Sequence, residues 1–181
     1  MREKLQTLPV SVLKEMAKEQ GLHIPVVYNS SGYEKAKTLK MLDGLVDIYL
    51  PDFKYMDAVL AKKYSHAQDY PEIAKEALSE MVRQVGEAEF DSRGMMKKGV
   101  IVRQLLLPGH VKDAKNVLKY LYETYGDRIY ISMMNQYTPM PAMKDDPQLS
   151  RKVTDREYER LIDYAILLGL KNGFMQEGET A

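Results

Sequence analysis

Short apolar runs alternate with segments of helical periodicity along most of this chain. Runs of strand-forming residues cover 24–28, 45–50, 100–107 and 129–134. Around and between them, apolar residues recur at helical spacing over 7–20, 34–42, 58–64, 71–85, 112–125 and 154–170. Strands that are apolar throughout and alternate with helices are typical of a parallel sheet covered by helices. The pattern therefore predicts an α/β fold.

This fold is expected to contain four parallel strands with helices on one outer side, as part of a barrel. The chain opens on a helix with no strand before it, and four strands cannot close a barrel of about eight. We expect residues 1–140 to hold the strand–helix units, and residues 141–181 to form a crossing loop, a last helix and a frayed tail. The charged, glycine-bearing segment 86–99 is expected to be a loop or a small excursion.

Helix ends are marked by capping signals. Asp57 is a good N-cap for the helix over 58–64, and Pro71 suits the first turn of the helix that Gly86 ends. Thr154 and Glu157 have the spacing of a capping box.

Charge and hydropathy restrict the class of partner. The chain has 181 residues, with 26 Lys and Arg against 26 Asp and Glu. This balance gives no support for binding nucleic acid or an acidic membrane. No apolar run approaches ~20 residues, and the start lacks a signal peptide, so we expect a cytoplasmic protein.

The absence of cysteine restricts the chemistry. The chain has no cysteine and three histidines, His23, His66 and His110. Disulfides, a cysteine nucleophile and an iron–sulfur cluster held by thiolates of this chain are therefore excluded. Scattered histidines do not predict a zinc site. We interpret His23 as structural, and His66 and His110 as loop or turn residues.

Polar residues gather at the C-terminal end of each predicted strand. These are Asn29, Ser30 and Ser31, then Asp52 and Lys54, then Arg103, Gln104 and His110, and finally Asn135, Gln136 and Tyr137. Parallel α/β folds bind ligands at this rim, so the residues are expected to converge on one site. Such groups suit a zwitterionic or ribose-bearing ligand.

A plainer interpretation also accounts for these residues. Strand ends meet water, and for that reason alone they are often polar. Asp52 and Lys54 are two residues apart, so in an extended segment they would lie side by side. They would then form a solvated ion pair of little energetic value.

Four motifs in this order carry a family resemblance. They are Val27-Tyr-Asn-Ser-Ser-Gly-Tyr33, Val46-Asp-Ile-Tyr-Leu-Pro-Asp-Phe-Lys-Tyr55, Ile101-Val-Arg-Gln-Leu-Leu-Leu-Pro-Gly109 and Tyr130-Ile-Ser-Met-Met-Asn-Gln-Tyr-Thr-Pro139. Together they resemble the later part of radical S-adenosylmethionine proteins related to pyruvate formate-lyase activating enzyme. The resemblance covers residues 8–140 and is greatest to an uncharacterised branch of that group.

The resemblance implies a partial (β/α)6 barrel, of which this chain would hold strands three to six. Members hold a four-iron four-sulfur cluster on a Cys-x3-Cys-x2-Cys loop after the first strand. They bind the amino group of S-adenosylmethionine through a Gly-Gly-Glu motif after the second. This chain contains neither motif.

The resemblance also implies a set of cofactor-binding residues. Asn29 stands where activating enzymes use an Asp near the cofactor, and Asp52 and Lys54 match the Asp-x-Lys that reaches S-adenosylmethionine. Arg103 matches the arginine of the fifth strand, whereas Thr138 stands where activating enzymes carry a His, which puts that contact in doubt. The strand ends add two further expected residues, Ser30 and Gln136.

By resemblance, the parent activity is reductive cleavage of S-adenosylmethionine to a 5′-deoxyadenosyl radical, which acts on a glycyl-radical protein or another substrate. We expect this chain alone to be inactive and to self-associate through the exposed edge of strand 24–28. One alternative is a non-redox aldolase-type enzyme with Lys54 as a Schiff-base amine, although the adjacent Asp52 favours the charged amine. The other is a scaffold or binding fragment without activity.

Overall fold

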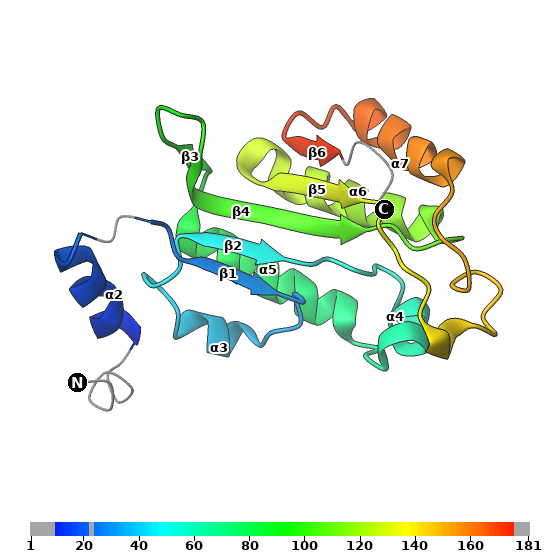
Figure 1. Cartoon of the computed structure of the whole chain (residues 1–181), viewed down its shortest axis with the longest axis horizontal. Helices are drawn as coiled ribbons and strands as arrows, with labels where there is room; N and C mark the ends of the chain where they lie inside the picture. The colour runs from blue at the N-terminus through cyan, green and yellow to red at the C-terminus, as the bar shows by residue number, and fades with distance from the viewer. Residues whose placement is uncertain (1–9, 22–23, 176–181) are drawn as a thin grey trace.

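The computed structural model describes residues 10–21 and 24–175, and it forms one mixed array of strands and helices (Figure 1). The strands are β1 (Val27–Ser30), β2 (Ile48–Pro51), β3 (Glu89–Phe90), β4 (Met96–Leu105), β5 (Tyr130–Met134) and β6 (Gly173–Met175). The α-helices are α2 (Val10–Glu19), α3 (Ala36–Lys40), α4 (Ala58–Ser65), α5 (Tyr70–Val85), α6 (Val111–Tyr125) and α7 (Asp155–Leu168). Single 3-10 turns are η1 (Gly126–Arg128) and η2 (Pro141–Met143).

The sheet confirms the predicted α/β class and the parallel pairing. Its order is β1-β2-β4-β5-β6, and each of these neighbours is parallel to the next. The strand–helix–strand crossovers through α3, α5, α6 and α7 account for this arrangement, because parallel neighbours need a long connection. All five carboxyl ends therefore point to the same edge.

Two segments contain strands that the sequence did not predict. Segment 86–99, expected to be a loop or a small excursion, is a hairpin in which β3 runs antiparallel to β4. Asp91 closes its turn by accepting the backbone N–H groups of Arg93 and Met95. The predicted tail from Lys171 also contains β6, which adds a parallel strand to β5.

Strand boundaries also shift from their predicted positions. The first strand covers 27–30 instead of 24–28, so Asn29 and Ser30 lie inside it. The third begins at Met96 because the hairpin lengthens it toward its N-terminus. His23, residues 7–9 of the first predicted helix and residues 176–181 lie outside the described residues.

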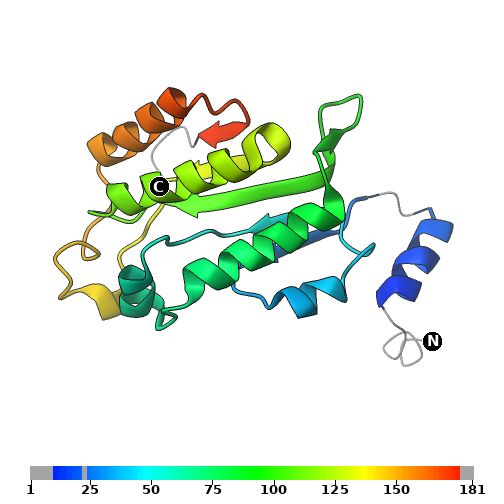
Figure 2. The ribbon, with the colours of Figure 1, turned by 180° about the vertical axis from the view of Figure 1, so that it is seen from behind.

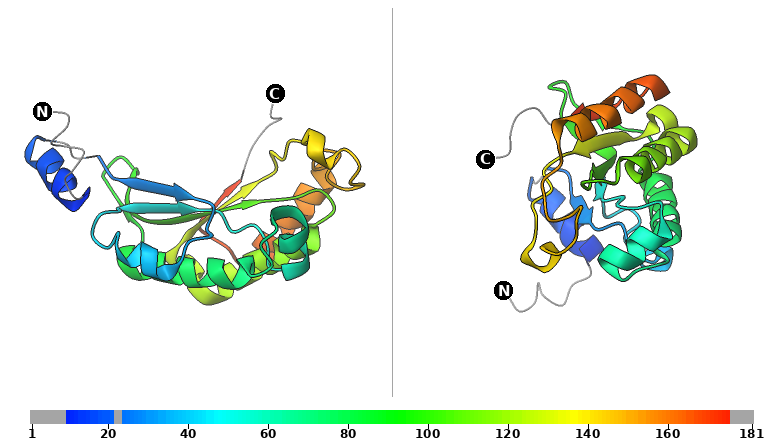
Figure 3. Two further views of the ribbon diagram at one scale, coloured as in Figure 1. Left: turned by 90° about the horizontal axis from the view of Figure 1, so that it is seen from below. Right: turned by 90° about the vertical axis from the view of Figure 1, so that its right-hand side faces the viewer.

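The helices cover one face of the sheet and leave the other open. Figure 3 shows α3, α5, α6 and α7 on the same outer side of the strands, as predicted, and Figure 2 shows α5 and α6 lying across that side. Helix α2 lies at the end of the sheet where the strands begin, and its Lys14 Nζ lies 2.9 Å from Asp47 Oδ1, just before β2. Among the described residues, no helix covers the open face.

The hydrophobic core fills the space between these helices and the sheet. Helix α5 buries one apolar side, which includes Ala77, Leu78 and Met81, and helix α6 buries Leu118 and Leu121. From the sheet, alternate strand residues pack against these helices. Four of them have side chains that are 0% exposed: Tyr49, Val100, Val102 and Ile131. Burial on this scale stabilises by roughly 25 cal/mol per Å² of apolar area. The other alternating set of strand residues faces the open side.

The predicted capping signals are confirmed. Asp57 accepts the Val59 N–H at the start of α4, and Pro71 lies in the first turn of α5. Thr154 and Glu157 form a complete capping box at α7. In the stretches that the structure describes, no helix has the length and apolar character needed to cross a membrane.

Candidate functional site

One row of side chains crosses the open face from strand to strand. Asp52 pairs with Arg103, Arg103 with Ser132, and Ser132 with Phe174 in the parallel register. Residues in register on neighbouring strands point to the same face of a sheet. The row therefore brings together residues from β4, β5 and β6 and from the segment after β2.

Arg103 joins the ends of β1 and β2. Its Nη2 donates to Asn29 Oδ1 at 2.8 Å and lies 2.7 Å from Asp52 Oδ1. Lys54 Nζ lies 3.7 Å from Asp52 Oδ2 on the other side of the carboxylate. We call Asn29, Asp52, Lys54 and Arg103 the Arg103 cluster. The structure thus brings together four of the six residues predicted to bind the cofactor.

The Arg103 cluster is partly shielded from water. The side chains of Asp52 and Arg103 are 25% and 27% exposed, against 39% for Lys54. Pairing between a guanidinium and a carboxylate is stronger in such a setting than on an open surface. The ion pair predicted as a solvated feature is therefore part of a larger polar group.

Arg103 retains unused donor capacity. Its Nε is buried and has no hydrogen-bond acceptor among the described residues. A buried donor without a partner costs about 1–3 kcal/mol, so a ligand acceptor placed there would lower the free energy. An anionic oxygen is the acceptor that a guanidinium prefers.

A hollow lies beside this arginine on the open face. It has a volume of about 340 Å³ and is lined by Arg103, Ser132, Met134, Gln136, Phe174 and Met175. Gln136, predicted from the strand end, thus lies next to the cluster. Ser132 lies between Arg103 and Phe174 in the register, and its small side chain leaves space for the hollow. The hollow therefore combines apolar side chains, such as Phe174 and Met175, with the guanidinium of Arg103.

Three aromatic rings extend from this hollow along the face. Phe174 stacks on Tyr130 with 5.6 Å between ring centroids, and Phe90 of the hairpin meets Tyr130 edge-on at 5.4 Å. Phe174 is 47% exposed and Phe90 is 43% exposed. No sequence pattern indicated Phe174, because the strand that carries it has only three residues.

Ser30 does not join the Arg103 cluster. Its hydroxyl donates to Glu34 at 3.1 Å and accepts the Gly32 N–H at 3.2 Å, so it shapes the turn after β1. Burial raises the pKa of the Glu34 carboxyl, and the Ser30 hydrogen bond partly offsets this. Of the six residues expected to bind the cofactor, Ser30 is the one that instead shapes a local turn.

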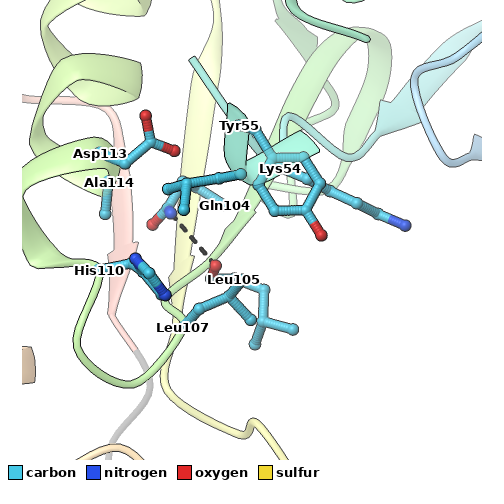
Figure 4. A pocket seen from close by; sticks show the side chains of 9 residues that line it. Lys54, Tyr55, Gln104, Leu105, Leu107, His110, Asp113 and Ala114 are labelled. Carbon is cyan, nitrogen blue, oxygen red and sulfur yellow. Dashed lines mark hydrogen bonds between the residues drawn. The ribbon is translucent and has the colours of Figure 1, made fainter. Parts of the chain in front are cut away.

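Gln104 is also directed away from the open face. It is 1% exposed, and its Nε2 donates to the Leu105 carbonyl at 3.2 Å. It lines a small cavity of about 10 Å³, where Figure 4 shows it between Lys54 and Tyr55 on one side and His110 and Asp113 on the other. The Lys54 amine points away from this cavity. The cavity has room for roughly one water molecule and is separate from the open face.

Asp113 is a buried carboxylate that the sequence did not reveal. It accepts the backbone N–H groups of Met56 and Asp57 at 3.2 and 2.9 Å. Burial raises the pKa of Asp113 to about 6, although these N–H donors act in the opposite direction. Its role is to tie α6 to the start of α4.

The two described histidines stay outside the Arg103 cluster. His110 Nε2 lies 2.9 Å from the Tyr64 hydroxyl, and burial lowers the pKa of its imidazole. His66 is the C-cap of α4 in the left-handed conformation, with φ 53°. Both occupy turns, as predicted.

The remaining residues of the last strand end differ in role. Tyr137 is buried and donates to the Leu149 carbonyl at 2.9 Å, so it anchors the crossing segment. Thr138 is exposed. Within the described residues, no group of three or more His, Cys, Asp and Glu could hold a metal ion.

Comparison with known proteins adds one relative. The chain is 27% identical over 143 residues to an uncharacterized protein of Methanocaldococcus jannaschii, an alignment that covers 79% of this chain. The chain spans 38% of the length of that relative. No family model matches the sequence. The assignment of a function therefore depends on the site itself.

Proposed function

We propose that this chain forms the later part of a radical S-adenosylmethionine partial barrel and that its Arg103 cluster contacts S-adenosylmethionine. One observation carries the proposal: Asn29, Asp52, Lys54 and Arg103, all predicted from the motifs, meet on the open face at the carboxyl ends of parallel strands. Ligands of parallel α/β folds bind at this edge. The parent architecture would be a (β/α)6 barrel, with β1, β2, β4 and β5 as its third to sixth strands.

The chemistry of the site fits this cofactor. S-adenosylmethionine carries an ammonium, a sulfonium, a carboxylate and a nucleoside. Asp52 provides an acceptor for a cation, Lys54 and Arg103 provide donors for a carboxylate, and Asn29 provides an amide for a hydroxyl. The hollow beside Arg103, with Phe174 and Met134 in its lining, suits a planar base.

An iron–sulfur cluster does not fit the residues of this chain. Such clusters are held by thiolates, and the sequence contains no cysteine. Any cluster in the parent reaction would need ligands from another polypeptide segment. In this proposal, the residues of this chain bind and orient the cofactor, and the radical would pass to a partner protein or another substrate.

A titration with S-adenosylmethionine, followed by NMR of the ¹⁵N-labelled chain, tests the proposal. We expect weak, saturable shifts confined to the residues around Asn29, Lys54 and Arg103. Asp52→Ala should weaken binding about tenfold, because it removes a charge-assisted contact. Asp163→Ala, which alters an exposed carboxylate of α7, is the matched control and should bind like the wild type.

Two outcomes would contradict the proposal. One is the absence of saturable shifts at millimolar S-adenosylmethionine in a folded wild-type chain. The other is covalent trapping of Lys54 by borohydride with a carbonyl substrate, which would favour the aldolase-type alternative. Thermal melting of each variant confirms that a loss of binding does not reflect unfolding.

A further inference from the structure

Tyr70, at the start of α5, reaches both segments that carry the Arg103 cluster. Its hydroxyl donates to the carbonyls of Ser31 and Asp52, at 2.9 and 3.1 Å, which share its one proton. The same oxygen accepts the Lys54 backbone N–H at 3.0 Å. One phenol oxygen therefore links the end of β1 to the two peptide groups that flank Phe53, directly after Asp52.

The position of this hydroxyl is fixed from the helix side. Tyr70 is 3% exposed, and its ring stacks on Tyr33 with 5.7 Å between centroids and an interplanar angle of 18°. Phe53 and Tyr55 meet it edge-on, at 6.4 and 5.5 Å. Burial raises the pKa of Tyr70, so the phenol remains a donor. These ring contacts fix the position of the Tyr70 ring. Its hydroxyl can therefore hold the segments that follow β1 and β2 in place.

Gly32 brings the same two segments into backbone contact. Its φ is +75°, and a Cβ atom there would lie 2.1 Å from the Asp52 carbonyl oxygen and 3.3 Å from the Tyr70 hydroxyl. Any side chain at this position would push the end of β1 away from Asp52. Gly44 has a similar φ of +78° but nothing within 4 Å of the same position.

We propose that Tyr70 and Gly32 form a clasp that positions Asn29 and Asp52 for ligand binding. The clasp sets the distance between the ends of β1 and β2, so that both side chains reach Nη2 of Arg103, at 2.8 and 2.7 Å. Tyr70 acts through the backbone and touches no ligand, so it is a positioning residue. The identity of the ligand rests on the proposed function, whereas the clasp itself does not.

Tyr70→Phe is the direct test, because it keeps the packed ring and removes the three hydrogen bonds. In the ligand-free chain, we expect the Arg103 Nε–H and Asn29 side-chain amide resonances to shift. With S-adenosylmethionine as the probe, affinity should fall about tenfold. Tyr125→Phe is the matched control, since Tyr125 is also buried but lies at the end of α6. It should change neither measurement.

A pair of glycine variants gives an independent test. Gly32→Ala and Gly44→Ala carry similar backbone strain, but only the first meets the Asp52 carbonyl. We expect Gly32→Ala alone to shift the Arg103 and Asn29 resonances. If Gly32→Ala does not fold, Tyr70→Phe still decides the question.

The outcomes separate the clasp from the proposed function. Shifted resonances in the two clasp variants, with no binding of S-adenosylmethionine by the wild type, would support the clasp and contradict the proposed function. Unshifted resonances and unchanged affinity in Tyr70→Phe would overturn the clasp, whatever the wild type binds.

Discussion

Asp113 shows how a single buried carboxylate sets a pH dependence of stability. Burial raises its pKa to about 6 in the folded chain, from 3.8. The folded state therefore holds this proton at pH values where the unfolded state has lost it. Asp113 thus stabilises most below about pH 4, and this contribution is lost as the pH rises through about 6.

We expect Asp113→Asn to remove this dependence while keeping an oxygen for the N–H groups of Met56 and Asp57. Relative to this variant, the wild type should lose about 2 kcal/mol of unfolding free energy between pH 4 and pH 7.5. Urea unfolding at both pH values measures the difference. Asp163→Asn, at an exposed position, is the control. A wild type and Asp113→Asn variant that run parallel across this range would refute the assignment.

For single residues, some contacts could be predicted from the sequence and others could not. Arg103 and Asp52 could be predicted to meet because parallel strands carry their carboxyl ends to one edge. Tyr70 and Asp113 could not, because Tyr70 precedes the predicted helix over 71–85 and Asp113 looks like an ordinary residue of the helix over 112–125. Only the fold locates the segments that each side chain holds. Phe174 was hidden in a segment too short to show strand periodicity.

At the scale of elements, the start of α7 is tied to two other segments through Glu157. Its carboxylate accepts the Thr154 N–H at 3.0 Å, the Gly109 N–H at 2.7 Å and two hydrogen bonds from Arg151. Arg151 holds the pKa of Glu157 well below its usual range. The capping box was predictable from spacing, whereas the contact with the loop before α6 needed the fold.

We expect Glu157→Gln to lower the unfolding free energy by about 1–2 kcal/mol at pH 7. The loss should fade as the pH falls below about 4.5, because a carboxylate with a depressed pKa stabilises only when it is ionised. This sign is opposite to that of Asp113. Denaturant unfolding at pH 7 and pH 3 gives the comparison, with Glu159→Gln on the exposed side of α7 as control. An equal loss at both pH values would show that packing, and not charge, is involved.

The elements that the sequence missed share one physical cause. The hairpin of β3 and β4 is built around Asp91 and Gly94, and the same turn chemistry is also typical of a loop. Strand β6 gains its stability from pairing with β5 and from the stack of Phe174 on Tyr130. Both are tertiary interactions, which override local propensity.

At the scale of the whole molecule, the open face and the edge of β1 determine how the chain behaves in solution. β1 pairs only with β2 in the described sheet, and Ile24, Val26 and Val27 beside this edge are 69%, 39% and 51% exposed. Unpaired edges with exposed apolar residues favour pairing with another chain. In the proposed radical chemistry, thiolates hold the iron–sulfur cluster, and this chain has none, so we expect no 5′-deoxyadenosine after anaerobic reconstitution with iron and sulfide.

We therefore expect the chain to form dimers or larger species at tens of micromolar, by size exclusion with light scattering. Val27→Lys should shift the population toward the monomer, because a charge on an edge strand opposes pairing. Val59→Lys is the matched control, since Val59 is 72% exposed on α4, away from the edge. A monomeric wild type would refute the prediction. Equal responses to the two lysines would place the contact elsewhere than at β1, and loss of dimer in Val27→Lys alone would locate it at this edge.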